Sequence, residues 1–166
     1  MLSRGMANER NILPTRADIT LLQLLQADSS RSIADLAEKA GLSTSACHRR
    51  VRALEEQGII RNYAARLDPE KLGIGINAFV EISLTSQSRE AMDRFEAAVA
   101  TFDDILECHL MSGNADYILR ICANDLRHFD SIHRNCLARL PGVSAMRSSF
   151  AIRSIKNWAG YPVNRV

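Results

Sequence analysis

The amino-acid sequence predicts an α+β protein with a helical N-terminal part and a C-terminal part of the order β-α-β-β-α-β. Up to residue 67, apolar residues recur every three or four positions, which is the period of an α-helix. After a stretch with Pro and Gly at 68–75, short apolar runs typical of strands are separated by two amphipathic helical patterns. A chain of 166 residues is long enough for two such domains.

The N-terminal part carries the start and stop signals of three helices, the first opened by Thr15 or Asp18 and ending near residues 27–30. Ser32 is a suitable N-cap for the second helix, and Asp35 stands at the acidic position of a capping box. Gly41 follows as a stop, because glycine adopts a left-handed conformation without steric cost, and Ser43 is the next N-cap. This is the helix-turn-helix pattern, whose second helix can enter the major groove of DNA.

The second helix of that pattern, expected from Thr44 to about Gln57, has an apolar and a polar side. Cys47, Val51 and Leu54 recur at helical spacing and are expected to pack inward. The polar side, the two caps and an arginine beyond the helix supply the candidates for contact with double-stranded DNA. These are Ser32, Ser43, Thr44, Ser45, His48, Arg49, Arg50, Arg52 and Arg61.

We expect these candidates to divide base reading from contact with the DNA backbone. The base-reading set is Ser45, His48, Arg49 and Arg52. Arginine binds a guanine edge with two hydrogen bonds, and short polar residues let the helix approach closely. Arg50 lies nearer the apolar side and, with Arg61, is expected to hold phosphates. A basic helix face can equally be the solvated side of a structural helix, which is the alternative for each of these side chains alone.

Beyond Gly58, residues 59–63 and 64–67 are expected to form a short strand pair, the wing of a winged helix-turn-helix. The charge distribution suggests that only this part of the chain meets phosphates. Residues 1–67 hold ten Lys and Arg against seven Asp and Glu, a balance of +3. Residues 68–166 hold eleven against twelve, a balance of −1.

The C-terminal part matches the ferredoxin-like plan, an antiparallel four-stranded sheet with two helices on one face. Strands are expected at 74–85, 105–111, 116–122 and 143–155, and helices around 92–102 and 129–140. In the first strand Ala78 and Val80 share one face and Phe79 lies on the other, and Leu119 is likewise opposite Ile118. Because both faces carry apolar residues, we expect a second copy of the chain to cover the open face in a two-fold dimer.

The expected domains are a flexible arm at 1–14, the winged helix-turn-helix at 15–67, a hinge at 68–75, a ferredoxin-like domain for effector binding and oligomerisation at 76–157, and a tail at 158–166. No stretch approaches the ~20 apolar residues of a membrane span.

The cysteines, Cys47, Cys108, Cys122 and Cys136, form no C-x-x-C pair and are expected to be reduced, buried thiols. Reduced thiols are typical of a cytoplasmic protein, which is the location we expect. Phosphate loops, nucleophile elbows and metal-ligand spacings are missing, so we expect no catalytic residues, metal or cofactor.

Several segments, taken in order, resemble the Lrp/AsnC family, the leucine-responsive or feast/famine regulators of bacteria and archaea. The resemblance covers about residues 16–157 and includes Leu36-Ala-Glu-Lys-Ala-Gly-Leu-Ser43, Cys47-His-Arg-Arg-Val-Arg-Ala-Leu-Glu-Glu-Gln-Gly-Ile-Ile60 and Glu107-Cys-His-Leu-Met-Ser-Gly113. It implies a winged helix-turn-helix joined to an α+β regulatory domain, in a transcription regulator of amino-acid metabolism associated with the nucleoid. Family members are dimers that assemble further, often into octamers, and many sense an amino acid.

By position, the resemblance places an amino-acid pocket at the loop after the second strand of the regulatory domain, with the last strand facing it across the assembly. The implied effector-binding residues are Met111, Ser112, Gly113, Asn114, Asp116, Tyr117, Ser148 and Ser149. Backbone N–H groups near Gly113 would bind the carboxylate of a free amino acid, and Asn114 or Asp116 its ammonium group. The loop reads Gly113-Asn114-Ala115-Asp116 where the family commonly has Gly-Asp-aromatic-Asp. A tight turn capped by Asp116 is the structural alternative.

Two other functions compete with a sensing regulator: an oligomeric amino-acid-binding module, and an architectural DNA-binding protein without an effector. An RNA-binding sheet is disfavoured, because the strands lack the aromatic residues on which bases stack.

Overall fold

The computed structural model describes residues 14–163, and the chain divides into two compact units. One unit comprises Met1–Ala65 together with Lys156–Val166, and the other comprises Arg66–Ile155. The arm expected at 1–14 lies, apart from Pro14, outside the described residues. None of the helices in the described range has the length and apolar character needed to cross a membrane.

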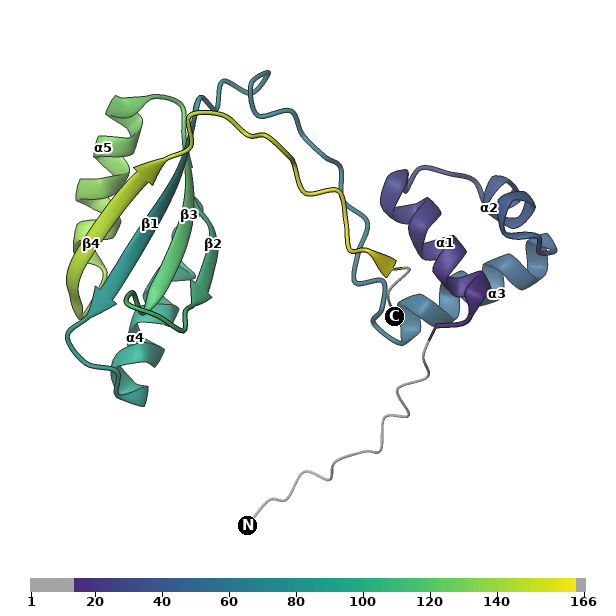
Figure 1. Cartoon of the computed structure of the whole chain (residues 1–166), viewed down its shortest axis with the longest axis horizontal. Coiled ribbons are helices and arrows are strands. Elements are labelled where there is room, and N and C mark those ends of the chain that lie inside the picture. The colour runs from purple at the N-terminus through teal and green to yellow at the C-terminus, as the bar shows by residue number, and fades with distance from the viewer. Residues whose placement is uncertain (1–13, 164–166) are drawn as a thin grey trace, which may run out of the picture. The chain divides into compact units, whose positions relative to one another are not determined.

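The first unit contains the three expected helices, α1 (Arg16–Ala27), α2 (Ile33–Ala40) and α3 (Thr44–Glu56) (Figure 1). Their shared core consists of Leu21, Leu36, Ala37, Cys47 and Val51. A complete capping box opens α1, because Thr15 Oγ1 accepts the N–H of Asp18 while the Asp18 carboxylate accepts the N–H of Thr15.

The capping box expected at α2 is only half formed. Ser32 Oγ accepts the N–H of Asp35 at 3.2 Å, as a cap should. The Asp35 carboxylate instead accepts from the basic side chains of Arg31, at 2.7 Å, and Lys39. Hydrogen bonds between ions are stronger than a bond to a neutral amide, so the two bases take the carboxylate.

The turn of the helix-turn-helix follows the sequence signals, but the strand pair expected at residues 59–63 and 64–67 does not form. Gly41 ends α2 with φ +66°, and Gly58 follows α3 with φ +69°. Residues 59–67, all of them described, form no strand pair. A tight hairpin needs positive φ angles at its turn, and this segment has neither Gly nor a residue with positive φ beyond Gly58. The hydroxyl of Tyr63 donates to Glu55 at 2.7 Å, which ties this extended segment to the end of α3.

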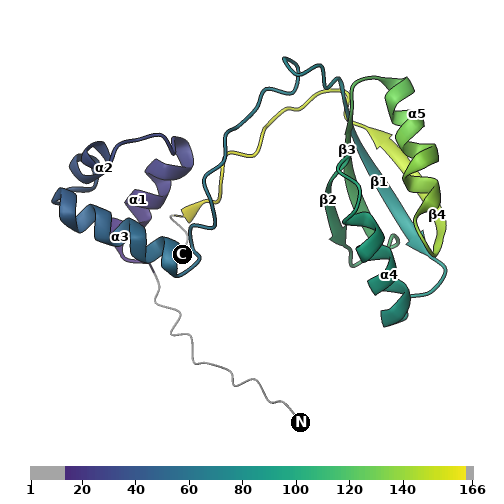
Figure 2. The same ribbon diagram turned by 180° about the vertical axis from the view of Figure 1, so that it is seen from behind.

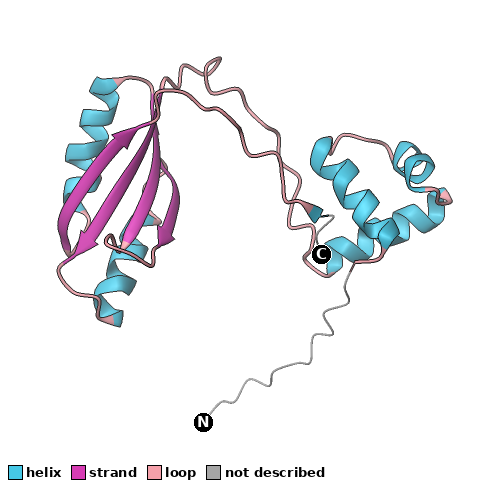
Figure 3. Cartoon of the chain, viewed as in Figure 1, coloured by secondary structure: helices cyan, strands magenta, loops and turns pink. Residues whose placement is uncertain are grey.

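The second unit has the ferredoxin-like plan expected from the sequence (Figure 3). Its elements are β1 (Ile76–Leu84), α4 (Arg89–Val99), β2 (Ile105–Leu110), β3 (Tyr117–Ala123), α5 (Leu126–Asn135), the 3₁₀ turn η1 (Leu137–Arg139) and β4 (Val143–Phe150). The strands lie in the order β2-β3-β1-β4, and all neighbours are antiparallel. The largest differences from the expected bounds are the ends of α5, at Asn135 rather than near 140, and of β4, at Phe150 rather than near 155.

Helices α4 and α5 cover one face of the sheet, as the two opposite views show (Figures 1 and 2). Ala78 and Val80 are fully buried on that face, whereas Phe79 is 39% exposed on the other. In β3, Leu119 is buried while Ile118 is only half-buried. The predicted alternation is therefore confirmed, and the face away from the helices is called the open face below.

The C-terminal segment, expected only as a tail, is hydrogen bonded to α1. Gln26 Nε2 donates to the carbonyl of Tyr161 at 3.1 Å, and Gln26 Oε1 accepts the N–H of Tyr161 at 2.7 Å. Gly160 has φ +109°, which residues with a Cβ rarely adopt, and a Cβ there would lie 2.5 Å from Gln26 Oε1, so another residue would be strained and would displace Gln26. The rings of Trp158 and Tyr161 meet edge to face at 5.7 Å. Residues 158–161, together with their hydrogen bonds to Gln26, are called the C-terminal clasp.

Gly160→Ala and Gln26→Ala are each expected to open the clasp, the first by steric conflict and the second by losing two hydrogen bonds of about 1 kcal/mol each. Trp158 is the only tryptophan of the chain, so quenching of its fluorescence by acrylamide reports on the clasp. We expect stronger quenching in both variants than in the wild type. Gln23→Ala, an exposed position of the same helix, is the control. Equal quenching in all four proteins would contradict the clasp.

Candidate nucleic-acid interface and ligand pocket

Helix α3 is fixed in the first unit by its cap and by its apolar side. Ser43 Oγ accepts the N–H of Ala46 at 3.2 Å and opens the helix. Cys47, Val51 and Leu54 are buried, as predicted. Because these three lie on one side at helical spacing, their burial determines which side chains of α3 face solvent.

The base-reading candidates all lie on the free side of α3. The exposed residues of the predicted set are Ser32, Ser43, Thr44, Ser45, His48, Arg49, Arg52 and Arg61. Arg52 Nε lies 3.3 Å from Glu56 Oε1, one turn further along, with both side chains exposed. An exposed pair of this kind is worth little, so it leaves Arg52 available to a stronger acceptor.

Among the predicted DNA-contact residues, Arg50 differs from the others because its side chain is bound to residues of α1 and is only partly exposed. Its Nη1 donates to Asp18 Oδ1 at 3.0 Å and to Thr15 Oγ1 at 3.1 Å, both at the start of α1. Burial raises the pKa of Asp18, but hydrogen bonds from Thr15 and Arg50 outweigh it and hold this pKa below the ordinary value. The carboxylate is thus charged at neutral pH, and Arg50 is paired with it although part of the arginine side chain remains exposed.

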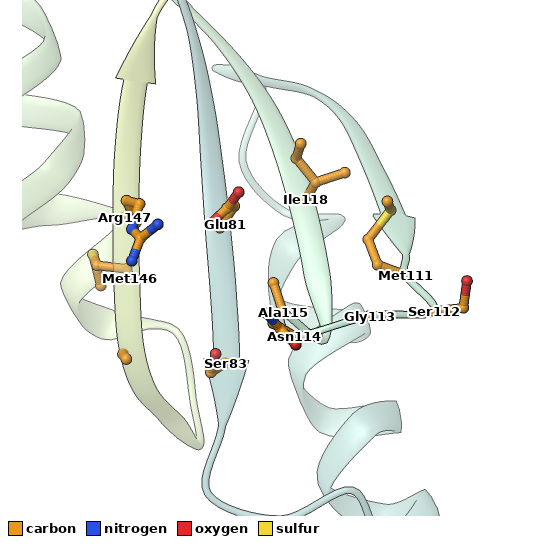
Figure 4. A pocket seen from close by; sticks show the side chains of 11 residues that line it. Glu81, Ser83, Met111, Ser112, Gly113, Asn114, Ala115, Ile118, Met146 and Arg147 are labelled. Carbon is orange, nitrogen blue, oxygen red and sulfur yellow. The ribbon is translucent and has the colours of Figure 1, made fainter.

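In the second unit, a cavity of about 480 Å³ opens on the open face beside the β2–β3 loop (Figure 4). Its lining includes residues 111–115 of that loop, so the predicted Met111, Ser112, Gly113 and Asn114 are brought together. This size falls within the range of about 300–1,000 Å³ typical of small-molecule sites.

Two charged residues of the cavity were missed by the sequence analysis. Glu81 of β1 and Arg147 of β4 both line it and are Cα partners across the two strands. Figure 4 shows them side by side on the open face. The alternation along β1 places Glu81 on the same face as Phe79, which was a usable signal. The register that brings Arg147 opposite Glu81 is a long-range property with no local signal.

Tyr117 is not part of the pocket, contrary to expectation. It is 1% exposed on the helix-covered face, with its ring 4.6 Å from that of Phe95. Its hydroxyl donates to Glu96 Oε1 at 2.7 Å, and burial together with Glu96 raises the pKa of Tyr117. An apolar ring with one satisfied hydroxyl belongs in a core, and the alternation of β3 assigns it there.

Asp116 also serves the fold in this structure. Its Oδ2 accepts the N–H of Leu84 at 2.6 Å, and its Oδ1 accepts from Gln87 Nε2 at 2.7 Å. Both carboxylate oxygens therefore tie the loop to the end of β1 and to Gln87 beyond it. This is a structural role, but it differs from the expected capping of the turn, because both donors lie outside the loop. Asp116 is absent from the cavity lining, whereas Asn114 is part of it.

The two serines expected on the last strand lie away from the cavity within the chain. Ser148 pairs with the buried Val80 and so lies on the helix-covered face. Ser149 pairs with Phe79 on the open face but does not line the cavity. The part of β4 that does so is 145–147, because the β1–β4 register places these residues nearest the loop.

The cysteines are free, but not all are buried. Cys47 and Cys136 are buried, and burial with the nearby Asp104 raises the pKa of Cys136 to about 11. Cys108 and Cys122 are only half-buried, because β2 is an edge strand and Cys122 lies on the open face. Within residues 14–163, no cluster of three or more His, Cys, Asp or Glu has a metal-binding arrangement.

Comparisons with known proteins agree with both units. Residues 15–61 match the family profile described as winged helix-turn-helix DNA-binding, and residues 77–159 match the Lrp/AsnC ligand binding domain. The Bkd operon transcriptional regulator of Pseudomonas aeruginosa is 39% identical over 140 residues, which is 84% of this chain and 92% of the relative.

Solved structures give the same result. An AsnC family transcriptional regulator from Agrobacterium tumefaciens has a TM-score of 0.87 and 37% identity, covering 91% of this chain and 98% of its own. A transcriptional regulator of Neisseria meningitidis in complex with L-Met has a TM-score of 0.86 and 34% identity, covering 91% and 97%. These matches define a DNA-binding transcription regulator with a separate ligand-binding domain. The chain belongs to the Lrp/AsnC family.

Proposed function

We propose that the protein acts as a homo-oligomer that reads a pseudo-palindromic operator with α3 and changes its DNA binding when an amino acid occupies the cavity. The observation that carries this proposal is the division of α3, whose apolar side is buried while Ser45, His48, Arg49 and Arg52 face solvent. A helix whose apolar side is buried and whose exposed side carries basic and short polar side chains fits the major groove. Arg61, exposed just beyond α3, is proposed to hold a phosphate.

We infer that a second copy of the chain covers the open face. That face presents Phe79, which is 39% exposed, and the half-buried Ile118, two large apolar side chains that a solvated sheet surface does not require. It also carries a polar cluster of three residues, in which Arg120 donates to Glu107 at 2.7 Å and to Asn77 at 3.2 Å. A two-fold contact of this kind pairs two copies of α3 with two half-sites, and octamers are a further assembly consistent with the family resemblance.

The cavity suits a free amino acid in size and in charge. Arg147 attracts a carboxylate and Glu81 an ammonium group, while Met111 and Ile118 offer apolar surface to a side chain. The N–H groups of the loop around Gly113 add donors for the carboxylate. A second copy against the open face would close the cavity, and the L-Met complex of the Neisseria relative supports an amino acid as the effector class.

Arg49→Ala is expected to cost about 1–3 kcal/mol of discrimination between operator and random DNA, because it removes a bidentate contact to guanine. The measurement is a gel shift on the DNA upstream of the gene and on random DNA, at several salt concentrations. Arg89→Ala, an exposed arginine of α4, is the control for lost charge. An unchanged specificity ratio in Arg49→Ala would remove this residue from base reading, and no specific binding by the wild type would reject the operator.

Phe79→Arg is expected to weaken the dimer about tenfold to hundredfold, because it places a charge in an apolar contact. Sedimentation velocity over a concentration series measures this. Leu126→Arg changes an apolar side chain that is 65% exposed on α5 and should leave the dimer unchanged. If the two variants sediment alike, the dimer contact lies elsewhere.

An amino acid at a hundredfold excess over its Kd should stabilise the folded protein by about 2.7 kcal/mol, which thermal unfolding detects. We would test each of the twenty amino acids, beginning with L-methionine, and repeat the gel shift with those that stabilise. Arg147→Ala should abolish the stabilisation, while Arg139→Ala, exposed outside the cavity, should retain it. If none of the twenty changes either measurement, the architectural alternative becomes the better proposal.

A further inference from the structure

A cluster of three side chains joins α3 to the start of α1. Asp18 Oδ1 accepts from Arg50 Nη1 at 3.0 Å, and Thr15 Oγ1 accepts from the same nitrogen at 3.1 Å. Asp18 Oδ2 accepts from the N–H of Thr15 at 2.9 Å and from its hydroxyl at 2.5 Å. Both oxygens of one carboxylate are thus used, one to cap α1 and the other to hold Arg50.

The carboxylate of the cluster is better shielded from water than the carboxylates of the other ion pairs described in this unit. The Asp18 side chain is 13% exposed and that of Arg50 is 36% exposed. The contact spans 32 residues, so it joins two separate helices rather than two turns of one helix. Fewer competing waters and a charged donor and acceptor make such a bond stronger than an exposed pair.

The position of Arg50 in α3 gives this contact a functional consequence. Arg50 directly follows the base-reading candidate Arg49 and precedes the buried Val51. The buried side of α3 alone leaves some freedom for the helix to roll, because apolar packing is not directional. A hydrogen-bonded arginine at the edge of that side restricts the roll, since its two acceptors lie on another helix.

We propose that Arg50 is a positioning residue, which holds the base-reading side of α3 in place through Asp18 and Thr15 and binds no phosphate. This inference rests on the proposed reading of DNA by α3. It replaces the phosphate contact expected for Arg50 from the sequence. Its physical basis is that a base-reading side chain must be placed within a fraction of an ångström to discriminate, whereas a phosphate contact tolerates more.

The substitution Asp18→Asn separates this inference from simple electrostatics. It removes a negative charge from a DNA-binding unit, so electrostatics alone predicts tighter binding to every DNA. Asparagine retains an oxygen that can cap α1, but it loses the charge that holds Arg50. Positioning predicts the opposite result on the operator, about tenfold weaker binding, while random DNA is bound no more weakly than by the wild type.

Asp28→Asn is the matched control, because it removes the same charge immediately after α1 without touching Arg50. Arg50→Gln is the second variant. A lost phosphate contact would weaken operator and random DNA alike and lower the slope of log K against log salt by about 0.9. A lost positioning contact weakens the operator alone and leaves this slope unchanged. Circular dichroism at the binding temperature confirms that each variant is folded.

The double variant D18N/R50Q completes a cycle that is read by thermal unfolding without any DNA. Coupling between the two substitutions, with the double variant no worse than the single ones, supports the contact itself. Additive losses would overturn it. Tighter operator binding by Asp18→Asn, or a reduced salt slope in Arg50→Gln, would overturn the positioning role. A wild type that does not discriminate operator from random DNA would reject the proposed function, while the unfolding cycle still decides whether Arg50 is held.

Discussion

One-sided burial is the constraint on which the functional surfaces of this protein depend. The free side of α3 exists because Cys47, Val51 and Leu54 occupy the other side. In the same way, Glu81 reaches the cavity because its neighbour Val80 is in the core. A slip of one residue in β1 would exchange these two roles, burying a carboxylate and exposing a valine, so the core fixes the site as firmly as it fixes the fold.

The sequence predicted well whatever depends on near neighbours in the chain. Helix starts, the glycine that ends α2, the order of the elements and the alternation along β1 all follow from local spacing. Three features were missed. The side of Ser148 depends on strand register and the partner of Arg50 lies 32 residues away, so both are decided by contacts between elements, which periodicity does not encode. The carboxylate of Asp35 instead binds Arg31 and Lys39, which lie four residues before and after it, so a local signal for this competition was present in the sequence.

The cavity and the proposed dimer contact share one face of one sheet. If a ligand and a second copy both contact that face, their binding energies are linked. A ligand that fits the closed cavity must then strengthen association, and association must strengthen ligand binding by the same factor. The concentration of the small molecule would thereby set the fraction of the protein that is associated, without any change in α4 and α5 on the other face of the sheet.

The C-terminal clasp makes the DNA-binding unit discontinuous in sequence. Its last segment arrives after the whole regulatory domain, so that domain is in effect an insertion within the unit, bounded near residues 66 and 155. A chimera that exchanges regulatory domains must therefore join the chain at two points rather than one. A fusion partner joined after residue 166 would be attached to the DNA-binding unit, although the order of the domains along the sequence suggests that it would be attached to the regulatory domain.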